Sequence, residues 1–228
     1  MEIKTFGTVT LILGDCNIFM KDLPDKAFDL GCVDPPYGIN GKFRTYHSPN
    51  QSQKNSLSKF KNVDWDNFTP SSKYWNELKR MSINQIIFGG NYFIEFLFNT
   101  RCWIVWDKMT YIPTMSQIEL AWTSFDENSR LIKINSNDEN RIHPTQKPVA
   151  LYEWLLKNYA KPGQTIIDTH AGSFSSAVAA LKMGFTYTGI EIDSDYYRMG
   201  CERVEAVYEA ITLGYAKTKL NKIQPTLF

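Results

Sequence analysis

The chain has 228 residues, a length that suits one large domain or two small ones. Hydrophobic residues make up 43% of it, aromatic residues 14% and charged residues 21%, a composition that supports a packed core and excludes an intrinsically disordered chain. Lys and Arg number 25 and Asp and Glu 24, so the formal net charge is +1. This balance excludes a wholly basic nucleic-acid coat protein and an acidic tail, but not a local basic patch.

Cysteine usage and the N-terminus indicate the compartment. The four cysteines (Cys16, Cys32, Cys102 and Cys201) form no C-x-x-C pair, which predicts reduced, mostly buried thiols and disfavours a disulfide framework or a zinc site. The first apolar run, residues 9–13, is too short for a signal peptide or a membrane span. We therefore expect a soluble, cytoplasmic protein without membrane contact.

Seven short apolar runs, rich in β-branched and aromatic residues, predict buried strands. In chain order these are residues 9–13, 28–33, 85–88, 103–106, 118–123, 165–168 and 187–192. Helical patterns cover residues 148–159, 175–183 and 195–213. Because strands alternate with helices, we expect one α/β domain over residues 1–228, with a mostly parallel sheet covered by helices on both faces.

A polar stretch from residue 39 to 73 interrupts this alternation. A loop of this length inside a compact domain is usually functional or mobile. Its first part, residues 42–61, contains basic residues interleaved with aromatic ones and no acid. The basic residues are Lys42, Arg44, Lys54, Lys59 and Lys61. This composition predicts a nucleic-acid contact through the phosphates, with a solvated insertion as the alternative.

The first chemical motif is D-P-P-Y, formed by Asp34, Pro35, Pro36 and Tyr37 directly after the predicted strand 28–33. The prolines force extended backbone and offer no N–H, so the turn presents carbonyl acceptors only. A carboxylate, a rigid carbonyl and an aromatic ring therefore meet at the carboxyl end of a strand, where open α/β sheets bind ligands. The motif suits a planar ring that bears an amino group; the alternative is an ordinary tight turn.

The second motif, T-I-I-D-T-H-A-G-S over residues 165–173, combines a predicted strand with a glycine turn before a helix. This arrangement is typical of a nucleotide cradle. Glu191 lies 19 residues past Gly172, close to the spacing at which an acid binds ribose hydroxyls. The alternatives are a plain strand–helix connection for Gly172 and a solvated acid for Glu191.

The third motif is R-I-H-P-T-Q-K-P over residues 141–148, directly before a predicted helix. Considered singly, His143 is interpreted as a structural histidine and Lys147 as an exposed lysine. The three motifs together are much more specific than any one of them.

In their types and order, these motifs resemble those of S-adenosylmethionine-dependent DNA amino-methyltransferases of the β class, in which D-P-P-Y precedes the glycine turn. The resemblance covers residues 11–204 with gaps in the middle. It implies a Rossmann-like, seven-stranded, mostly parallel sheet with one antiparallel strand. It also implies S-adenosylmethionine as cofactor, no metal, DNA as partner and direct methyl transfer to a flipped base. D-P-P-Y rather than S-P-P-Y favours adenine N6.

The resemblance also implies roles for individual residues. Catalytic and base-binding roles fall on Asp34, Pro35, Pro36 and Tyr37. Cofactor-binding roles fall on Asp15, Cys16, Asp34, Lys147, Asp168, His170, Gly172, Ser173 and Glu191. A homodimer and a cognate restriction nuclease are further partners to be tested.

The glycine turn departs from the family pattern D-P-F-x-G-S-G-T-T. Thr169, His170 and Phe174 replace its Pro, its Phe and its second Gly. Phe174 would crowd the cofactor unless its side chain points back into the sheet. The alternatives are a cytosine-N4 enzyme, a weak or inactive relative that binds nucleic acid, and a nicotinamide oxidoreductase. The last is disfavoured because the chain has no G-x-G-x-x-G.

Overall fold

The computed structural model describes residues 1–39, 66–110, 116–136 and 141–223, with side chains described as far as Gly214. In this part of the chain, nine strands form one sheet in the order β1-β2-β9-β8-β3-β4-β6-β5-β7. The strands are β1 (Glu2–Phe6), β2 (Val9–Leu13), β3 (Phe28–Val33), β4 (Ser82–Phe88), β5 (Trp103–Asp107), β6 (Ile118–Thr123), β7 (Arg130–Lys133), β8 (Thr165–Asp168) and β9 (Thr186–Glu191).

The five central strands, β2, β9, β8, β3 and β4, run parallel. β1 pairs antiparallel with β2 at one edge. Towards the other edge, β6 runs antiparallel to both β4 and β5, and β7 runs parallel to β5. The expected α/β fold with a mostly parallel sheet is confirmed.

The expected number of seven strands is wrong. All seven apolar runs form strands, but β1 and β7 are added at the two edges of the sheet. Their sequences are not apolar, and Ile3 and Leu131 are about as exposed as surface residues, at 59% and 60%. An edge strand is held mainly by backbone hydrogen bonds to one neighbour, so it needs no hydrophobic run.

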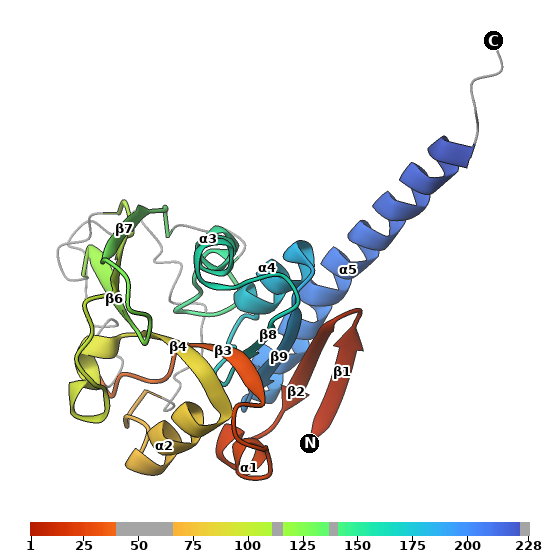
Figure 1. The fold of residues 1–228 in the computed structure, drawn as a ribbon. Helices are drawn as coiled ribbons and strands as arrows, with labels where there is room; N and C mark the ends of the chain where they lie inside the picture. Colours follow the sequence, from red (N-terminus) through yellow and green to blue (C-terminus); the bar gives the residue numbers. More distant parts are fainter. Residues whose placement is uncertain (40–65, 111–115, 137–140, 224–228) are drawn as a thin grey trace, which may run out of the picture.

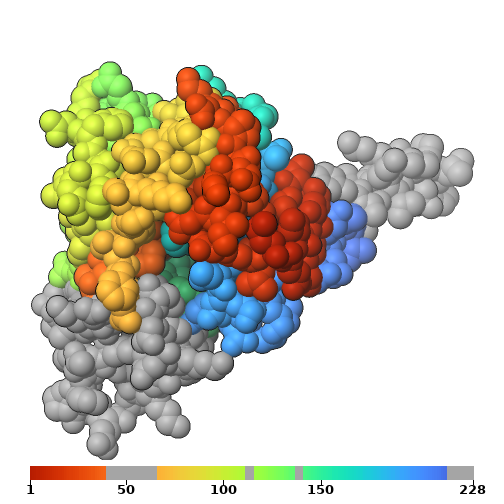
Figure 2. Space-filling model, turned by 90° about the horizontal axis from the view of Figure 1, so that it is seen from below, coloured from red at the N-terminus to blue at the C-terminus, as the bar shows by residue number. Residues whose placement is uncertain are grey.

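Helices cover both faces of the sheet. Those of the described residues are α1 (Cys16–Lys21), α2 (Ser72–Met81), α3 (Val149–Tyr159), α4 (Ser175–Met183) and α5 (Ser194–Ile223), with two 3-10 turns, η3 (Gly90–Tyr92) and η4 (Ile94–Phe96). In Figure 1, α1 and α2 lie below the sheet, and α3, α4 and the start of α5 lie above it. Figure 2 shows the lower face, where α1 (red) and α2 (orange) lie side by side.

The helical patterns in the sequence predict α3, α4 and α5, but not α1 and α2. α1 has only six residues, too few to show a helical period. α2 begins at Ser72, inside the stretch that was predicted as a loop as far as residue 73. Four apolar side chains of α2 are nevertheless buried: Tyr74, Trp75, Leu78 and Met81.

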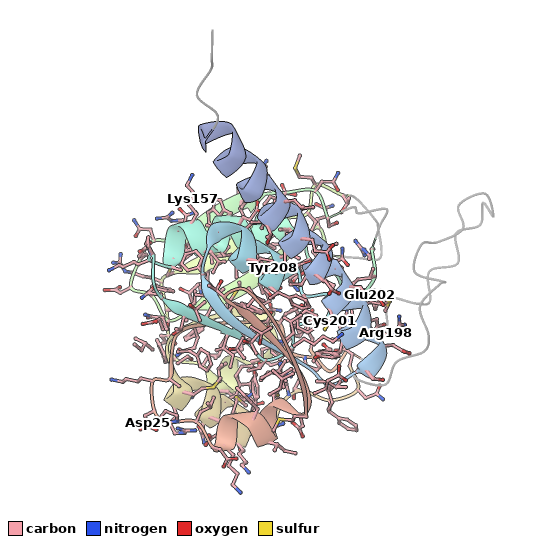
Figure 3. The ribbon with its side chains drawn as sticks, turned by 90° about the vertical axis from the view of Figure 1, so that its right-hand side faces the viewer. Asp25, Lys157, Arg198, Cys201, Glu202 and Tyr208 are labelled. Carbon is pink, nitrogen blue, oxygen red and sulfur yellow. The ribbon has the colours of Figure 1, made fainter. Side chains whose placement is uncertain are left out.

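Successive residues of the central strands point into two hydrophobic cores, as the period of a strand requires. In β3, Cys32 belongs to the core under α3, α4 and α5, and Val33 to the core under α1 and α2. The helix α5 has one inward and one outward side. Cys201 is buried against the sheet, while Arg198 and Glu202 point outward and pair at 3.2 Å (Figure 3).

All four cysteines are free and buried, as expected from their spacing. Within the described residues, no helix is long and apolar enough to cross a membrane, and no cluster of His, Cys, Asp and Glu suits a metal ion.

Candidate active site

The site lies where the winding direction of the sheet reverses. β3 and β8 are neighbours although their paired residues are 136 positions apart in the sequence, with Leu30 opposite Ile166 and Gly31 opposite Ile167. From this junction, α2 leads to β4 over one face of the sheet, and α4 leads to β9 over the other. The loops that follow β3 and β8 therefore diverge at their carboxyl ends and leave the crevice in which such folds bind ligands. D-P-P-Y follows β3, and the glycine turn follows β8.

The D-P-P-Y turn is held by hydrogen bonds from residues distant in sequence. The Tyr37 backbone N–H donates to Asp66 Oδ1 at 2.8 Å, and the Gly38 N–H donates to the same oxygen at 3.2 Å. The Tyr37 hydroxyl reaches back to Asp34 Oδ1 at 2.7 Å. Asp34 is therefore fixed relative to the ring that follows it.

The Tyr37 ring lies against a bare stretch of backbone at the end of β4. A Cβ added to Gly89 would stand 2.3 Å from the ring, so only glycine leaves room for it. The exposed ring of Tyr92 stacks on Tyr37, with centroids 4.9 Å apart and an angle of 15° between the planes. Phe93 meets Tyr37 edge-on at 6.0 Å. These contacts give Tyr37 a defined orientation beside Asp34.

Lys147 is buried and pairs directly with Asp34. Its Nζ lies 2.5 Å from Asp34 Oδ2, although 113 residues separate the two. Its side chain is only 4% exposed, and Nζ also lies 4.5 Å from the centre of the Phe88 ring. The interpretation of Lys147 as an exposed lysine is wrong, because the tertiary fold supplies two carboxylates that compensate its buried charge.

The second carboxylate belongs to Glu119 on β6. Its Oε1 lies 2.6 Å from Lys147 Nζ and accepts a hydrogen bond from the Tyr37 hydroxyl at 2.8 Å. Its Oε2 pairs with Lys108 Nζ at 3.1 Å. Asp34, Glu119, Lys147 and Lys108 thus form a half-buried cluster of two anions and two cations around the Tyr37 hydroxyl.

Burial and charge within the cluster shift the pKa values of its members. Burial raises the pKa of Asp34, and the Lys147 ammonium works in the opposite direction. Burial also opposes ionisation of Glu119, but Lys147 and Lys108 outweigh it and lower the pKa of Glu119 to about 2. For Lys147, burial favours the neutral amine, yet Asp34 and Glu119 raise its pKa. Asp34 is therefore the more easily protonated of the two carboxylates.

The glycine turn after β8 is tied to the end of β9. Gly172 adopts a positive φ of 52°, and its N–H donates to Glu191 Oε2 at 2.7 Å. The other oxygen of Glu191 accepts the Asp193 N–H at 2.9 Å. A carboxylate has about four acceptor positions, so Glu191 retains capacity for ligand hydroxyls. The interpretation of Glu191 as a merely solvated acid is wrong, since its side chain is 9% exposed.

Asp168 is buried at the end of β8. It accepts hydrogen bonds from the His170 N–H at 3.1 Å and from the Ser176 hydroxyl at 2.7 Å. Burial raises the pKa of Asp168 to about 7, and these two hydrogen bonds oppose the shift. These two hydrogen bonds thus connect Asp168 to the turn and to the start of α4.

The remaining predicted cofactor residues are distributed around this turn. Asp15 follows β2, whose Leu13 is opposite Glu191 in the sheet, and it caps α1 through the Asn17 N–H at 2.8 Å. Cys16 is buried at the start of α1. These two residues therefore lie on the Glu191 side of the crevice.

His170 and Ser173 are held by protein partners. His170 Nδ1 lies 3.0 Å from the Thr169 hydroxyl, and burial lowers the pKa of His170 to about 4, so the ring is neutral at pH 7. The Ser173 hydroxyl lies 3.1 Å from that of Ser175, and its carbonyl accepts a hydrogen bond from Arg203. These contacts fix the turn onto α4 and α5.

Phe174 points away from the crevice. Its φ is 55°, the conformation for which the family pattern has glycine, and its side chain is fully buried. The ring fills a space that Gly200 of α5 leaves open, because a Cβ there would lie 2.1 Å from it. The left-handed backbone costs about 1–2 kcal/mol. Burying a phenylalanine ring contributes about 1.5–3 kcal/mol, which offsets this cost. Phe174 therefore does not crowd the turn.

The comparisons with known proteins agree with this geometry. A family described as "DNA methylase" (N6_N4_Mtase) matches residues 105–202. YubD of Escherichia coli K12, described as a methylase, is 29% identical over 224 residues, which cover 90% of this chain and 94% of YubD. The DNA adenine methyltransferase YhdJ of the same organism is 38% identical over 85 residues, 37% of this chain and 29% of YhdJ. The chain is thus similar to DNA methylases over residues 105–202 and to YubD over most of its length.

Solved structures share the fold of this chain at low sequence identity. A Thermus thermophilus protein described as a DNA modification methylase, complexed with S-adenosyl-L-methionine, has a TM-score of 0.56 at 17% identity, over 87% of this chain and 95% of that one. The cytosine-N4-specific PvuII DNA methyltransferase has a TM-score of 0.59 at 11% identity, over 92% and 96%. The resemblance seen in the sequence is confirmed.

Sequence reasoning missed Glu119, Lys108 and Asp66. Glu119 was visible as the one acid within the apolar run 118–123. The sequence pattern does not mark it as a site residue, because the first residues of a parallel strand lie at the amino ends of the strands, away from the site. The nucleic-acid residues Lys42, Arg44, Lys54, Lys59 and Lys61 lie outside the described residues.

Proposed function

We propose that this DNA methylase relative transfers a methyl group from S-adenosylmethionine to the exocyclic N6 of an adenine in DNA. One observation carries the proposal. The Asp34 carboxylate, held by Tyr37 at the end of β3, lies beside the glycine turn that follows the neighbouring strand β8 and that Glu191 anchors. An acceptor for an amino group and a cradle for a nucleotide-like cofactor thus share one crevice.

The residues around the glycine turn fit S-adenosylmethionine. Gly172 brings bare backbone to the crevice, and the carboxylate of Glu191 retains acceptor positions for the two ribose hydroxyls. Asp15 and Cys16 border the same side of the crevice. The bound cofactor supplies a methyl group already activated on a sulfonium, so no covalent intermediate with the protein is needed. A relative in fold was crystallised with this molecule.

Asp34 and the Pro35 carbonyl act on the amino group of the target base. The lone pair of an exocyclic amine is delocalised into the ring, which makes the amine a poor nucleophile. Hydrogen bonds from its two N–H groups to Asp34 and Pro35 localise this lone pair as positive charge develops on nitrogen. The Tyr37 ring, which stacks with Tyr92, lies beside Asp34, and the base has to leave the duplex to reach this position.

The choice of adenine rests on the D-P-P-Y residues and on the partial match to the adenine enzyme YhdJ. The fold also matches a cytosine-N4 enzyme, so the fold alone supports either amine. The inactive-relative alternative rests on Phe174 and His170. The ring of Phe174 is buried away from the turn, and the ring of His170 is held by the Thr169 hydroxyl, which weakens this alternative.

The test is product analysis by mass after digestion of DNA incubated with the protein and S-adenosylmethionine. We expect N6-methyladenine. N4-methylcytosine would overturn the assignment of the base, and no methylated base would overturn the proposed reaction.

The Asp34→Asn variant then tests the assigned role. Asparagine keeps the size of the side chain but replaces one acceptor oxygen by a donor, so we expect kcat to fall about 10²–10³-fold. Cofactor affinity, measured by calorimetry, should stay within about twofold of the wild type. The exposed Asp25, which pairs with Arg80 away from the crevice (Figure 3), gives the matched control Asp25→Asn. Loss of cofactor binding in Asp34→Asn would contradict the assigned role.

A further inference from the structure

Both carboxylate oxygens of Asp34 already have donors in this structure. Oδ1 accepts the Tyr37 hydroxyl at 2.7 Å, and Oδ2 accepts the Lys147 ammonium at 2.5 Å. A target amino group that binds Asp34 therefore competes with two groups of the protein itself. Lys147 is the stronger competitor, because it is charged and almost fully buried.

Glu119 contacts both competitors through a single oxygen. Its Oε1 lies 2.6 Å from Lys147 Nζ and 2.8 Å from the Tyr37 hydroxyl. A tyrosine hydroxyl has one proton, so Tyr37 donates to either Asp34 or Glu119 at a given moment. Each group that occupies Asp34 thus has a second carboxylate within hydrogen-bond distance, and neither needs to cross the site to reach it.

Charge makes this second carboxylate necessary. If Lys147 left Asp34 without another partner, a buried ammonium would lose its counter-ion, which is strongly unfavourable. Lys108 neutralises the other oxygen of Glu119 at 3.1 Å, so the pair of Glu119 and Lys108 remains balanced in either state.

We propose that Glu119 is a positioning residue that retains the Lys147 ammonium and the Tyr37 hydroxyl when Asp34 turns to the amino group of the target base. This inference rests on the proposed methyl transfer. It assigns to a residue outside D-P-P-Y the task of freeing Asp34 for the substrate.

The Glu119→Gln variant tests the proposal. Glutamine keeps an oxygen but loses the charge, so Lys147 binds Asp34 alone and competes better with the base. We expect KM for DNA to rise on the order of tenfold with a smaller change in kcat. Cofactor affinity should not change. Glu153→Gln is the matched control, because Glu153 pairs with Lys182 on α4, away from the cluster.

The Lys147→Met variant separates an effect through Lys147 from a general effect of charge. In the double variant Glu119→Gln/Lys147→Met, the competitor is absent and the cluster keeps one anion and one cation. We therefore expect its KM to return towards the wild-type value, below that of Glu119→Gln. The charge-balanced double variant also keeps the test valid if Glu119→Gln does not fold.

The pH profile gives a readout that a purely structural role would not produce. Activity needs ionised Asp34, so it falls as the pH drops through the pKa of this carboxyl. Lys147 lowers this pKa and Glu119 raises it, while Asp168 faces Asp34 as a like charge only above its own pKa of about 7. We expect the acid limb to move to lower pH in Glu119→Gln and to higher pH in Lys147→Met. Both variants keep the side chains of Tyr37 and Lys108.

The outcomes distinguish this inference from the proposed function. A wild-type protein that methylates no base overturns the proposed function and the inference with it. An active wild type with a Glu119→Gln variant that behaves like Glu153→Gln overturns the inference alone. So does a double variant as impaired as Glu119→Gln, or an acid limb that moves in the opposite direction.

Discussion

At the scale of single residues, the glycine turn depends on a large side chain at Phe174 and on the absence of a side chain at Gly200. Phe174 occupies a backbone conformation that favours glycine, and its ring fills the space above Gly200. The departure from the family pattern is therefore compensated inside the core between β9 and α5. On the side that faces the crevice, the turn presents its backbone.

Gly200→Ala tests this packing. Alanine in place of glycine within a helix normally stabilises by about 1 kcal/mol. Here the added Cβ would lie 2.1 Å from the Phe174 ring, so we expect the free energy of unfolding to fall by about 1–3 kcal/mol. Urea denaturation measures the change.

Gly214→Ala in the same helix is the control, because a Cβ there meets no atom of the described residues within 4 Å. It should leave stability unchanged or slightly raised. The double variant Phe174→Ala/Gly200→Ala should cost less than the two single changes together, since the clash is absent. Full additivity would show that the two side chains do not compete for one space.

At the scale of elements, α1 starts at the edge of the crevice and depends on its cap. Asp15 accepts the Asn17 N–H and lies next to the end of β9, so it combines a structural contact with a proposed contact to the cofactor. Two substitutions at the same position can separate these roles.

Asp15→Ala removes the capping oxygen, and we expect it to lower the free energy of unfolding by about 1 kcal/mol. Asp15→Asn keeps that oxygen and loses only the charge, so stability should change by a few tenths of a kcal/mol. If the carboxylate contributes to cofactor binding, Asp15→Asn should weaken it several-fold in calorimetry. Unchanged cofactor affinity in Asp15→Asn would show that the residue is a cap alone.

At the scale of the whole molecule, the net charge of +1 conceals an uneven distribution along the chain. The basic stretch 42–61 follows D-P-P-Y directly in the sequence, and D-P-P-Y lies at the carboxyl end of β3, where the site is. Three other exposed lysines belong to segments that lead back to the amino ends of the parallel strands, away from the site. These are Lys21, Lys157 and Lys161.

Replacing Lys54, Lys59 and Lys61 by alanine tests the proposed DNA contact. Each lost phosphate contact should reduce the slope of log K against log salt by about 0.9. Fluorescence anisotropy with labelled DNA at several salt concentrations measures this slope. The same replacement of Lys21, Lys157 and Lys161 should leave the slope unchanged; an equal effect would mean that binding is not localised to residues 42–61.

The sequence by itself determined the central architecture and the two halves of the site. Buried strands need continuous apolar runs, so all seven runs marked strands. The Asp34 and Gly172 motifs each followed one of them, because ligand-binding turns follow strand ends. Local pattern could not find β1 and β7, whose edge positions require no apolar run. It could not find α1 either, which is shorter than two helical turns.

Only the tertiary structure decided how the site is completed. β6 runs antiparallel to β4, so its first residues, Glu119 among them, lie at the carboxyl edge of the parallel strands, beside Asp34 and Lys147. The orientation of the Phe174 ring likewise depends on the absence of a side chain at Gly200, 26 residues away. Strand direction and the space between distant elements are properties of the packed chain. No local pattern of residues encodes them.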